Sequence, residues 1–339
     1  MKARTFARLV AAASFPLALA AARADPVADF YRGKVVNLLI GINVGGSYDI
    51  QARMVARYIG AHIPGNPTIV PQNMVGAGGL AMANYLEGVA PHDGTALGMM
   101  ANTLIPYQVV GGTGVKFDAG KMNWIGSMES PPDVVVGRAA SGLKSAADLK
   151  TRDVSIAASA RGAITYVIPS MLNEFAGARF KIVTGYQGSP SMNLAMERGE
   201  VDAIVNSWPS LKAVKPEWFA SGSAIILARS QTKRADLQGI PAIESLAPDP
   251  EDRQAMELVL AGNPLGRPLA FPRDVPPERV KAVRDAFDAV MKDPAFREEA
   301  ARTGYDLEPA SGEELQRIVT RILATPKRIA DKAKPIIAP

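Results

Sequence analysis

Short apolar runs and amphipathic stripes alternate along the chain, with glycine-rich turns between them. The run 35–40 is almost continuously apolar, which is typical of a strand buried on both faces of a parallel sheet. It ends near Gly45, and Ser47 is placed to cap a helix whose apolar stripe comprises Ile50, Met54, Val55, Tyr58 and Ile59. Further strands are expected at 68–70, 95–100, 133–136, 154–157, 182–183 and 201–205, and further helices at 81–86, 165–175 and 190–199. This repeated order of strand, turn and helix predicts βαβ units and a parallel sheet.

The last hundred residues are predicted to be mostly helical. One apolar stripe follows the prolines at 276–277 and comprises Val280, Val283, Phe287 and Val290. Ser311 and Glu314 form a capping box ahead of another amphipathic helix. Between these parts, the segment from Ala224 to Ala228 is expected to return the chain to the first domain. We therefore predict two α/β lobes joined by a double crossover: residues 25–130 and 224–339 form lobe 1, and residues 131–223 form lobe 2.

Four turns lie where a predicted strand leads into a predicted helix: 45–49, 76–79, 158–165 and 186–190. In an open parallel sheet such turns lie at the carboxyl ends of the strands, where ligands bind. Each also exposes unpaired N–H groups at a helix N-terminus, which attract anions. Glycine in any single turn could serve only to make the turn. Four such turns together favour a cleft that encloses a small anion between two lobes.

The first 24 residues have the layout of a secretory signal peptide. Lys2, Arg4 and Arg8 form a basic lead, residues 9–22 are apolar and alanine-rich, and residues 22–24 are an A-x-A cleavage site. The apolar run is too short for a membrane span, which needs about 20 residues. We expect cleavage after Ala24 and a periplasmic protein.

Export changes how the composition is interpreted. The chain carries 38 Lys and Arg against 33 Asp and Glu, but four of the basic residues lie in the predicted signal, which leaves 34 against 33. This balance, without a basic run, gives no support for a nucleic-acid partner. The chain contains no cysteine, which excludes a disulfide framework, a thiolate nucleophile and a zinc–thiolate site.

Catalytic functions have little support in the sequence. Residues 76–81 match the looser dinucleotide fingerprint G-x-G-x-x-A, but Pro71 stands where the preceding central strand should run. The two histidines, His62 and His92, are expected in surface loops and offer little from which to build a hydrolytic triad or a transition-metal site. We expect no enzymatic activity, no cofactor and no metal.

The turns resemble, in order and spacing, the signature blocks of the tripartite tricarboxylate transporter substrate-binding proteins, the Bug receptor family. The blocks are VGGSYD at 44–49, MVGAGG at 74–79, APHDGT at 90–95, GYQGSP at 185–190 and GEVDA at 199–203. The similarity covers essentially the whole chain after the signal. It implies a type 2 periplasmic-binding-protein fold with a ligand cleft between the lobes. It also implies small carboxylate ligands, held largely by backbone amides, hydroxyls and water, and delivery to one large and one small membrane subunit.

The predicted ligand-binding residues lie at these turns and strand ends: Gly45, Gly46, Ser47, Asp49, Gly78, Asn102, Ser159, Arg161, Thr165, Tyr186, Gly188, Ser189 and Asn206. Asp49 is expected to organise the first turn, because a carboxylate would repel an anionic ligand. The turn of the second lobe departs from the family, since Ala158 and Ala163 replace expected hydroxyls. Arg161 adds a guanidinium that either grips a carboxylate bidentately or points into solvent.

We therefore predict a monomeric periplasmic receptor that binds a small organic acid and delivers it to a tripartite tricarboxylate-type transporter. A sensor subunit that presents the bound ligand to a signalling membrane protein is one alternative, because it would use the same closing cleft. A periplasmic hydrolase is the other alternative. It would need an activated nucleophile or base, and the sequence offers no persuasive one.

Overall fold

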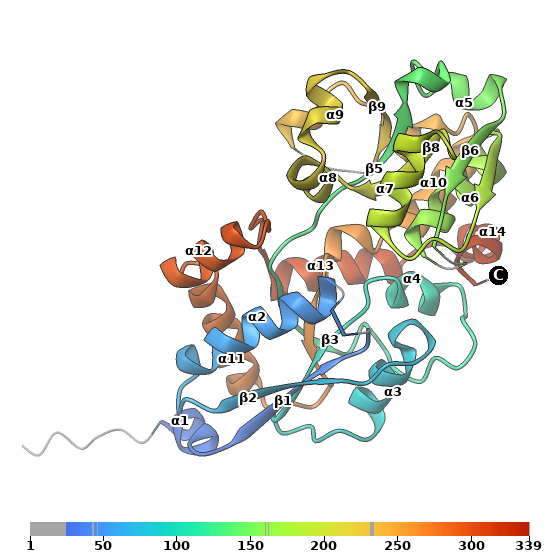
Figure 1. Ribbon diagram of the computed structural model, residues 1–339. Helices are drawn as coiled ribbons and strands as arrows, with labels where there is room; N and C mark the ends of the chain where they lie inside the picture. Colours follow the sequence, from blue (N-terminus) through green and yellow to red (C-terminus); the bar gives the residue numbers. More distant parts are fainter. Residues whose placement is uncertain are drawn as a thin grey trace, which may run out of the picture.

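The computed structural model describes residues 25–42, 44–45, 47–159, 161, 163–230 and 234–338. The chain forms two α/β lobes, each built on one mixed sheet (Figure 1). The predicted signal peptide and Gly46 lie outside the described residues. Among the described residues, no helix combines the length and the apolarity needed to cross a bilayer.

The sheet of the first lobe has six strands in the order β11-β4-β10-β3-β1-β2. They are β1 (Val35–Ile40), β2 (Thr68–Asn73), β3 (Ala96–Met99), β4 (Asn123–Ser127), β10 (Leu269–Phe271) and β11 (Ala310–Ser311). β1 pairs in parallel with β2 and β3, whereas β10 and β11 pair antiparallel with their neighbours. The predicted parallel sheet is therefore parallel in only one half. Pro71 lies in β2, which is an edge strand, where a residue without an N–H group is tolerated.

The sheet of the second lobe has five strands in the order β7-β6-β8-β5-β9. They are β5 (Asp133–Arg138), β6 (Val154–Ala157), β7 (Phe180–Val183), β8 (Ala203–Ser207) and β9 (Ala224–Arg229). β6 is parallel to β7 and β8, and β5 is antiparallel to β8 and β9. The expectation that the chain returns to the first lobe at Ala224 is wrong, because β9 completes this second sheet beside β5. The chain re-enters the first sheet only with β10.

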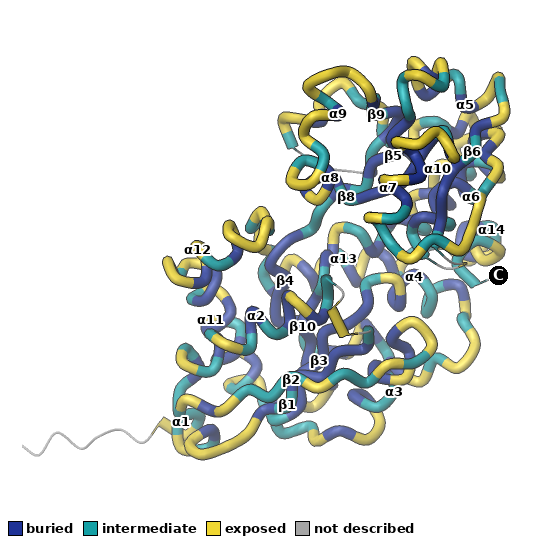
Figure 2. The backbone as a smooth tube through the Cα atoms, viewed as in Figure 1, coloured by how far each residue is buried: buried dark blue, intermediate teal, exposed yellow. Residues whose placement is uncertain are grey.

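Helices cover both faces of the first sheet. Successive side chains of β1 point to opposite faces, so they pack into two different apolar clusters. Val36, Leu38 and Ile40 belong to one apolar cluster and Leu39 to another. The helices that contribute to the first cluster are α1 (Pro26–Tyr31), α2 (Ser47–His62), α11 (Pro277–Val290) and α12 (Pro294–Arg302). Those on the other face are α3 (Leu80–Gly88), α4 (Leu104–Val109) and α13 (Gly312–Leu323). Figure 2 shows the central strands buried between these layers.

The core of the Leu39 face continues into the second lobe. It includes apolar side chains of α6 (Ile164–Ala176), α10 (Pro250–Leu260) and α14 (Lys327–Ile337). The remaining helices of the second lobe are α5 (Asp148–Thr151), α7 (Ser189–Arg198), α8 (Trp208–Val214) and α9 (Pro216–Ala220). Because α10 and α14 pack on α6, parts of the segment 224–339 lie against the second sheet. The other residue boundaries of the two lobes stay a prediction.

Most of the local predictions are confirmed, with small shifts. The stripe of α11 is buried, and the capping box of Ser311 and Glu314 starts α13. Ile50 is an exception, since it is exposed on α2 and does not face the core. Ser189 is the first residue of α7 and Gly188 its N-cap, one residue earlier than predicted.

Candidate functional site

Asp49 organises the turn that leads from β1 into α2. Its buried carboxylate accepts hydrogen bonds from the N–H of Gly45 at 2.9 Å, from Arg53 Nε at 2.9 Å and from Asn73 Nδ2 at 3.0 Å. Burial by itself would raise the pKa of Asp49, but these donors outweigh burial and lower it. The carboxylate of Asp49 is thus held by protein donors and organises the turn that contains Gly45 and Ser47.

A cation that the sequence analysis missed lies beside this turn. Arg267, in the segment just before β10, donates from Nε and Nη2 to Ser47 Oγ at 3.3 and 3.1 Å. Its guanidinium also lies over the ring of Tyr48 and 3.6 Å from a carboxylate oxygen of Glu129. Burial raises the pKa of Glu129, although Arg267 and a hydrogen bond from Gln51 oppose the shift. The first turn therefore combines the N-terminus of α2 with a guanidinium from a distant part of the chain.

The second turn brings another stretch of backbone to the same end of the sheet. Ala77 and Gly78 have positive φ values of 46° and 64° in a short 3₁₀ turn before α3. A Cβ atom at Gly78 would meet nothing within 4 Å, so the backbone there is open on its outer side. Asn102, just after β3, donates its N–H to the hydroxyl of Tyr48 at 3.3 Å, which ties this strand end to the first turn.

The turn between β6 and α6 is closed by its own hydroxyls. Thr165 is buried, and its Oγ1 accepts from the N–H of Ser159 at 3.1 Å and lies 3.2 Å from the Ser159 hydroxyl. Arg161 is exposed, and its guanidinium lies over the ring of Tyr166 at 5.9 Å. It forms no ion pair with any of the described residues. Thr165 thus supports the turn, while Arg161 is accessible to a ligand.

The last turn, between β7 and α7, contains three of the predicted residues. The N–H of Tyr186 donates to the carbonyl oxygen of Ala158, which joins this turn to the previous one. Ser189 Oγ donates to Asn206 Oδ1 at 3.2 Å, and Gly188 precedes it as the N-cap of α7. Asn206 is buried and also accepts from the N–H of the next residue, so it supports the turn from the end of β8.

A hollow of about 320 Å³ lies between the two lobes, beside the second turn. Ala77, Gly78 and Thr103 line it from the first lobe, and Val167 of α6 lines it from the second. Thr103 follows Asn102 directly, and Val167 lies two residues after Thr165. Of the predicted site residues, Gly78 lines this hollow.

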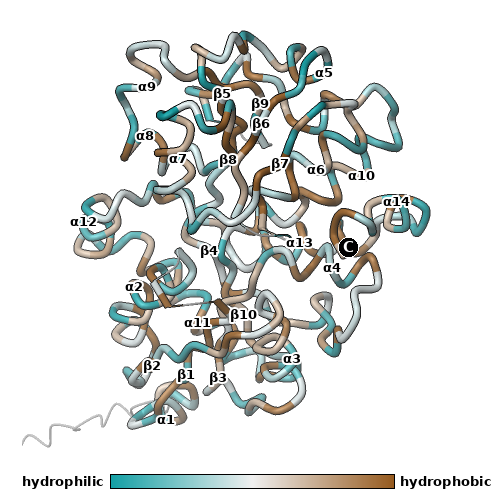
Figure 3. The backbone as a smooth tube through the Cα atoms, turned by 45° about the vertical axis from the view of Figure 1, so that its right-hand side comes forward, coloured by the Kyte–Doolittle hydropathy of each residue, from teal (hydrophilic) through white to brown (hydrophobic). Residues whose placement is uncertain are grey.

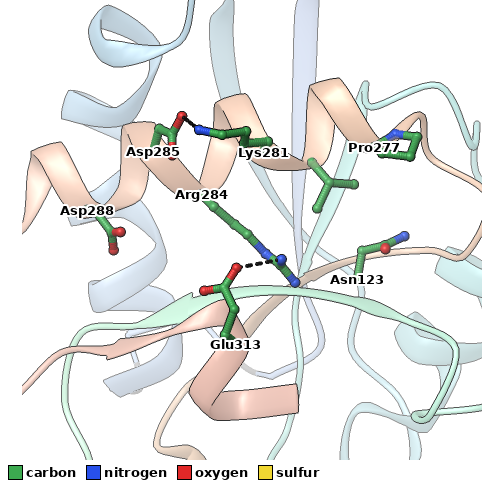
Figure 4. A pocket seen from close by; sticks show the side chains of 8 residues that line it. Asn123, Pro277, Lys281, Arg284, Asp285, Asp288 and Glu313 are labelled. Carbon is green, nitrogen blue, oxygen red and sulfur yellow. Dashed lines mark hydrogen bonds and ion pairs between the residues drawn. The ribbon is translucent and has the colours of Figure 1, made fainter. Parts of the chain in front are cut away.

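Another hollow, of about 290 Å³, lies outside the cleft among β4, α11 and α13 (Figure 4). Four of its charged side chains form two pairs: Lys281 with Asp285 at 2.5 Å, and Arg284 with Glu313 at 2.8 Å. Arg284 also donates to the carbonyl oxygen of Trp124. Arg284 thus joins α11 to β4 and α13, and the hollow between the lobes is the better candidate site. Among the described residues, no group of three or more His, Asp or Glu side chains is arranged to hold a metal ion.

Comparisons with known proteins agree with this geometry. Residues 52–334 match the family model described as tripartite tricarboxylate transporter family receptor. The UPF0065 protein in the gbd 5' region of Cupriavidus necator is 28% identical over 317 residues, which cover 88% of this chain and 87% of that protein.

Two solved structures have the same fold. A TctC solute binding protein from Polaromonas, without ligand, is 19% identical with a TM-score of 0.66, over 89% of this chain and 99% of that one. Rpa4515 from R. palustris, solved with adipate, is 20% identical with a TM-score of 0.61, over 88% of this chain and 97% of that one.

Proposed function

Because the chain belongs to the tripartite tricarboxylate transporter receptor family, we propose that it is a periplasmic receptor that binds a small carboxylate between its two lobes. The observation that carries this proposal is the hollow shared by the glycine turn at Gly78 and by α6 of the second lobe. A ligand that touches both surfaces stabilises the closed arrangement of the lobes, because it binds that arrangement more tightly than the open one.

The chemistry of the turns favours a carboxylate ligand. α2, α6 and α7 each begin at one of the predicted turns, and the N–H groups at a helix N-terminus attract anions. Two guanidinium groups add positive charge: Arg267, which holds Ser47 in the first lobe, and Arg161, which is exposed in the second. The adipate bound by the structurally similar Rpa4515 is a carboxylate of this kind, which supports the assignment.

We divide the predicted site residues by what their side chains do. Those whose polar groups are exposed or only partly buried are proposed to contact the ligand: Gly45, Ser47, Gly78, Asn102, Ser159, Arg161, Tyr186, Gly188 and Ser189. Asp49, Thr165 and Asn206 are buried and are proposed to position the turns. Gly46 keeps its proposed role from the sequence alone.

Calorimetry and a thermal-shift screen against small organic acids test the proposal. A ligand that binds only the native state raises the apparent stability by RT ln(1 + [L]/Kd). Small-angle scattering with the best acid is expected to show a smaller radius of gyration than without it. If no acid stabilises the protein, the proposed function is wrong.

Arg161 gives the sharpest test of the ligand contacts. Arg161→Ala is expected to weaken binding by about 1.5–3 kcal/mol, as for a hydrogen bond to a charged group, or about tenfold or more in Kd. Arg161→Lys should recover only part of the loss, because an ammonium cannot form the two parallel hydrogen bonds that a guanidinium makes with a carboxylate. Arg179→Ala is a matched control, since Arg179 is an exposed arginine that pairs with Asp153 at the opposite end of the strands. Wild-type affinity in Arg161→Ala would mean that this guanidinium faces solvent.

Export and delivery complete the proposal. Asp25 caps α1, with its carboxylate accepting from the N–H groups of Val27 and Ala28 at 3.0 and 3.3 Å. Cleavage after Ala24 would leave this cap intact, and N-terminal sequencing of periplasmic protein should begin at Asp25. We propose that the mature chain acts as a monomer and delivers its ligand to one large and one small membrane subunit. Deletion of either subunit should abolish uptake of the acid.

A further inference from the structure

The hollow between the lobes has walls of an unexpected kind for a site that takes an anion. Besides Ala77, Gly78 and Thr103, its lining comprises Leu80, Leu104, Pro106, Tyr107, Thr113, Val167, Val259 and Ile337. None of these residues carries a charge. They come from α3 and α4 of the first lobe and from α6, α10 and α14, which pack together where the lobes meet. Figure 3 shows the hydrophobic C-terminal end of the chain next to α4.

The polar groups on this lining are few, and the largest is already used. The hydroxyl of Tyr107 donates to the carbonyl oxygen of Thr113 at 3.2 Å, in the loop after α4. The aromatic ring of Tyr107 remains as an apolar part of the lining. Leu80 and Leu104 are almost fully buried, so the apolar floor is part of the core that joins the lobes. A second carboxylate placed here would lose its hydration and find no charged partner, which is unfavourable.

The apolar walls continue directly into the glycine turn. Ala77 and Gly78 line the hollow, and they are also part of the turn that we propose for the ligand carboxylate. Exposed apolar side chains stand beside the first two turns as well: Val44 is 72% exposed, Val75 55% and Ile50 41%.

We propose that the ligand is an amphiphilic monocarboxylate, whose carboxylate meets the turns and whose apolar chain or ring fills this hollow. This inference rests on the proposed receptor function and names the class of acid. A volume of about 320 Å³ lies within the range of small-molecule pockets, about 300–1,000 Å³. A compact polyacid would leave the apolar part of the hollow empty, while an acid with one apolar end would bury that end against side chains of both lobes.

Calorimetry with two matched series of acids tests the inference: straight-chain monocarboxylates from butanoate to decanoate, and dicarboxylates of the same chain lengths. Benzoate serves as the aromatic probe. Affinity for the monocarboxylates is expected to rise about fourfold per added methylene, which is about 0.8 kcal/mol, until the hollow is full. Each dicarboxylate is expected to bind more weakly than the monocarboxylate of equal length.

Val167→Asn places an amide on the wall of the hollow and is expected to reduce the gain per methylene, with little effect on butanoate. Val214→Asn is the matched control, because Val214 is an exposed valine at the end of α8, outside the hollow. Circular dichroism and thermal unfolding check that both variants are folded. If Val167→Asn unfolds, Ile337→Ser tests the same wall from α14.

The outcomes separate this inference from the proposed function. Dicarboxylates that bind more tightly than monocarboxylates of equal length, with no effect of Val167→Asn, would overturn the amphiphilic ligand and leave the carboxylate receptor standing. If no acid of either series binds, the receptor function fails and this inference fails with it. A rising series that Val167→Asn flattens and Val214→Asn does not would support both.

Discussion

Replacing Asp49 by Asn distinguishes a carboxylate that organises the first turn from one that faces the ligand, because the two roles predict opposite changes in affinity. A carboxylate that faces an anionic ligand repels it, so its neutralisation should tighten binding. Asp49 is only 3% exposed and accepts hydrogen bonds from Gly45, Arg53 and Asn73. We therefore expect Asp49→Asn to weaken binding and to lower the stability of the protein.

The size of the effect follows from the donors that the amide would leave unsatisfied. Asn has one accepting oxygen, so its NH₂ group must face either the N–H of Gly45 or the pair formed by Arg53 and Asn73. At least one hydrogen bond to a charged acceptor is lost, which costs about 1.5–3 kcal/mol. Arg53 is 38% exposed and can be rehydrated, so we expect about 2 kcal/mol in the free energy of unfolding. Part of this cost reappears on binding, because the ligand must then order the turn, and Kd should rise several-fold.

The pH dependence gives an independent check of the same residue. The pKa of Asp49 is lowered in the folded protein, so its carboxylate stabilises the fold above the usual pKa of Asp. This stabilisation is lost as the pH falls through the lowered value. The stability difference between wild type and Asp49→Asn should therefore be largest near neutral pH and shrink in acid.

Urea unfolding and calorimetry with an acid from the screen measure both quantities. Asp93→Asn is the matched control, since Asp93 accepts from the N–H and the hydroxyl of Thr95 just before β3, at the opposite end of that strand from Asn102. It should lose stability without losing affinity. Tighter binding by Asp49→Asn at unchanged stability would refute the organising role.

Two further predictions concern the segments that cross between the lobes. Burial raises the pKa of Asp133 to about 6, although Arg267 and Asn263 oppose the shift. Ionising this carboxyl therefore lowers the stability of the folded protein, and this loss increases as the pH rises from about 4 to about 6. Urea unfolding over this range should show wild type losing up to about 3 kcal/mol relative to Asp133→Asn; a constant difference would contradict this. Gly266→Ala should cost several kcal/mol, because its φ is +62° and a Cβ atom would lie 1.8 Å from the carbonyl oxygen of Glu129. An unchanged urea midpoint would contradict that prediction.

The elements that could be predicted from the sequence are those fixed by neighbouring residues. The strand at 35–40, the stripe of α11 and the capping box at Ser311 each depend on a local pattern, and each is confirmed. The segment from Ala224 to Ala228 was expected to return the chain to the first lobe, but it forms β9 of the second sheet. A local apolar run predicts a strand but not which strand it pairs with. Here the neighbouring strand is β5, about ninety residues earlier in the chain. The antiparallel strands β4 and β10 were not predicted, and β10 is too short, at three residues, to give a clear periodic pattern.

The candidate site divides in the same way. The positions of the turns could be predicted because each follows its strand directly, and the ligand contacts at these turns stay a prediction. Arg267 contacts Ser47 across 220 residues, and no local sequence pattern predicts that contact. The backbone explains how this contact is possible. Gly266 adopts a positive φ and approaches Glu129 so closely that any side chain would collide, and this approach brings the next residue against the first turn. Glu129 lies in the crossover from β4 to β5, so Arg267 connects the hydroxyl of Ser47, a proposed ligand contact, to the segment that joins the two sheets. We therefore expect ligand contact at Ser47, if the proposed site is right, to be coupled to the position of this crossover through the guanidinium of Arg267.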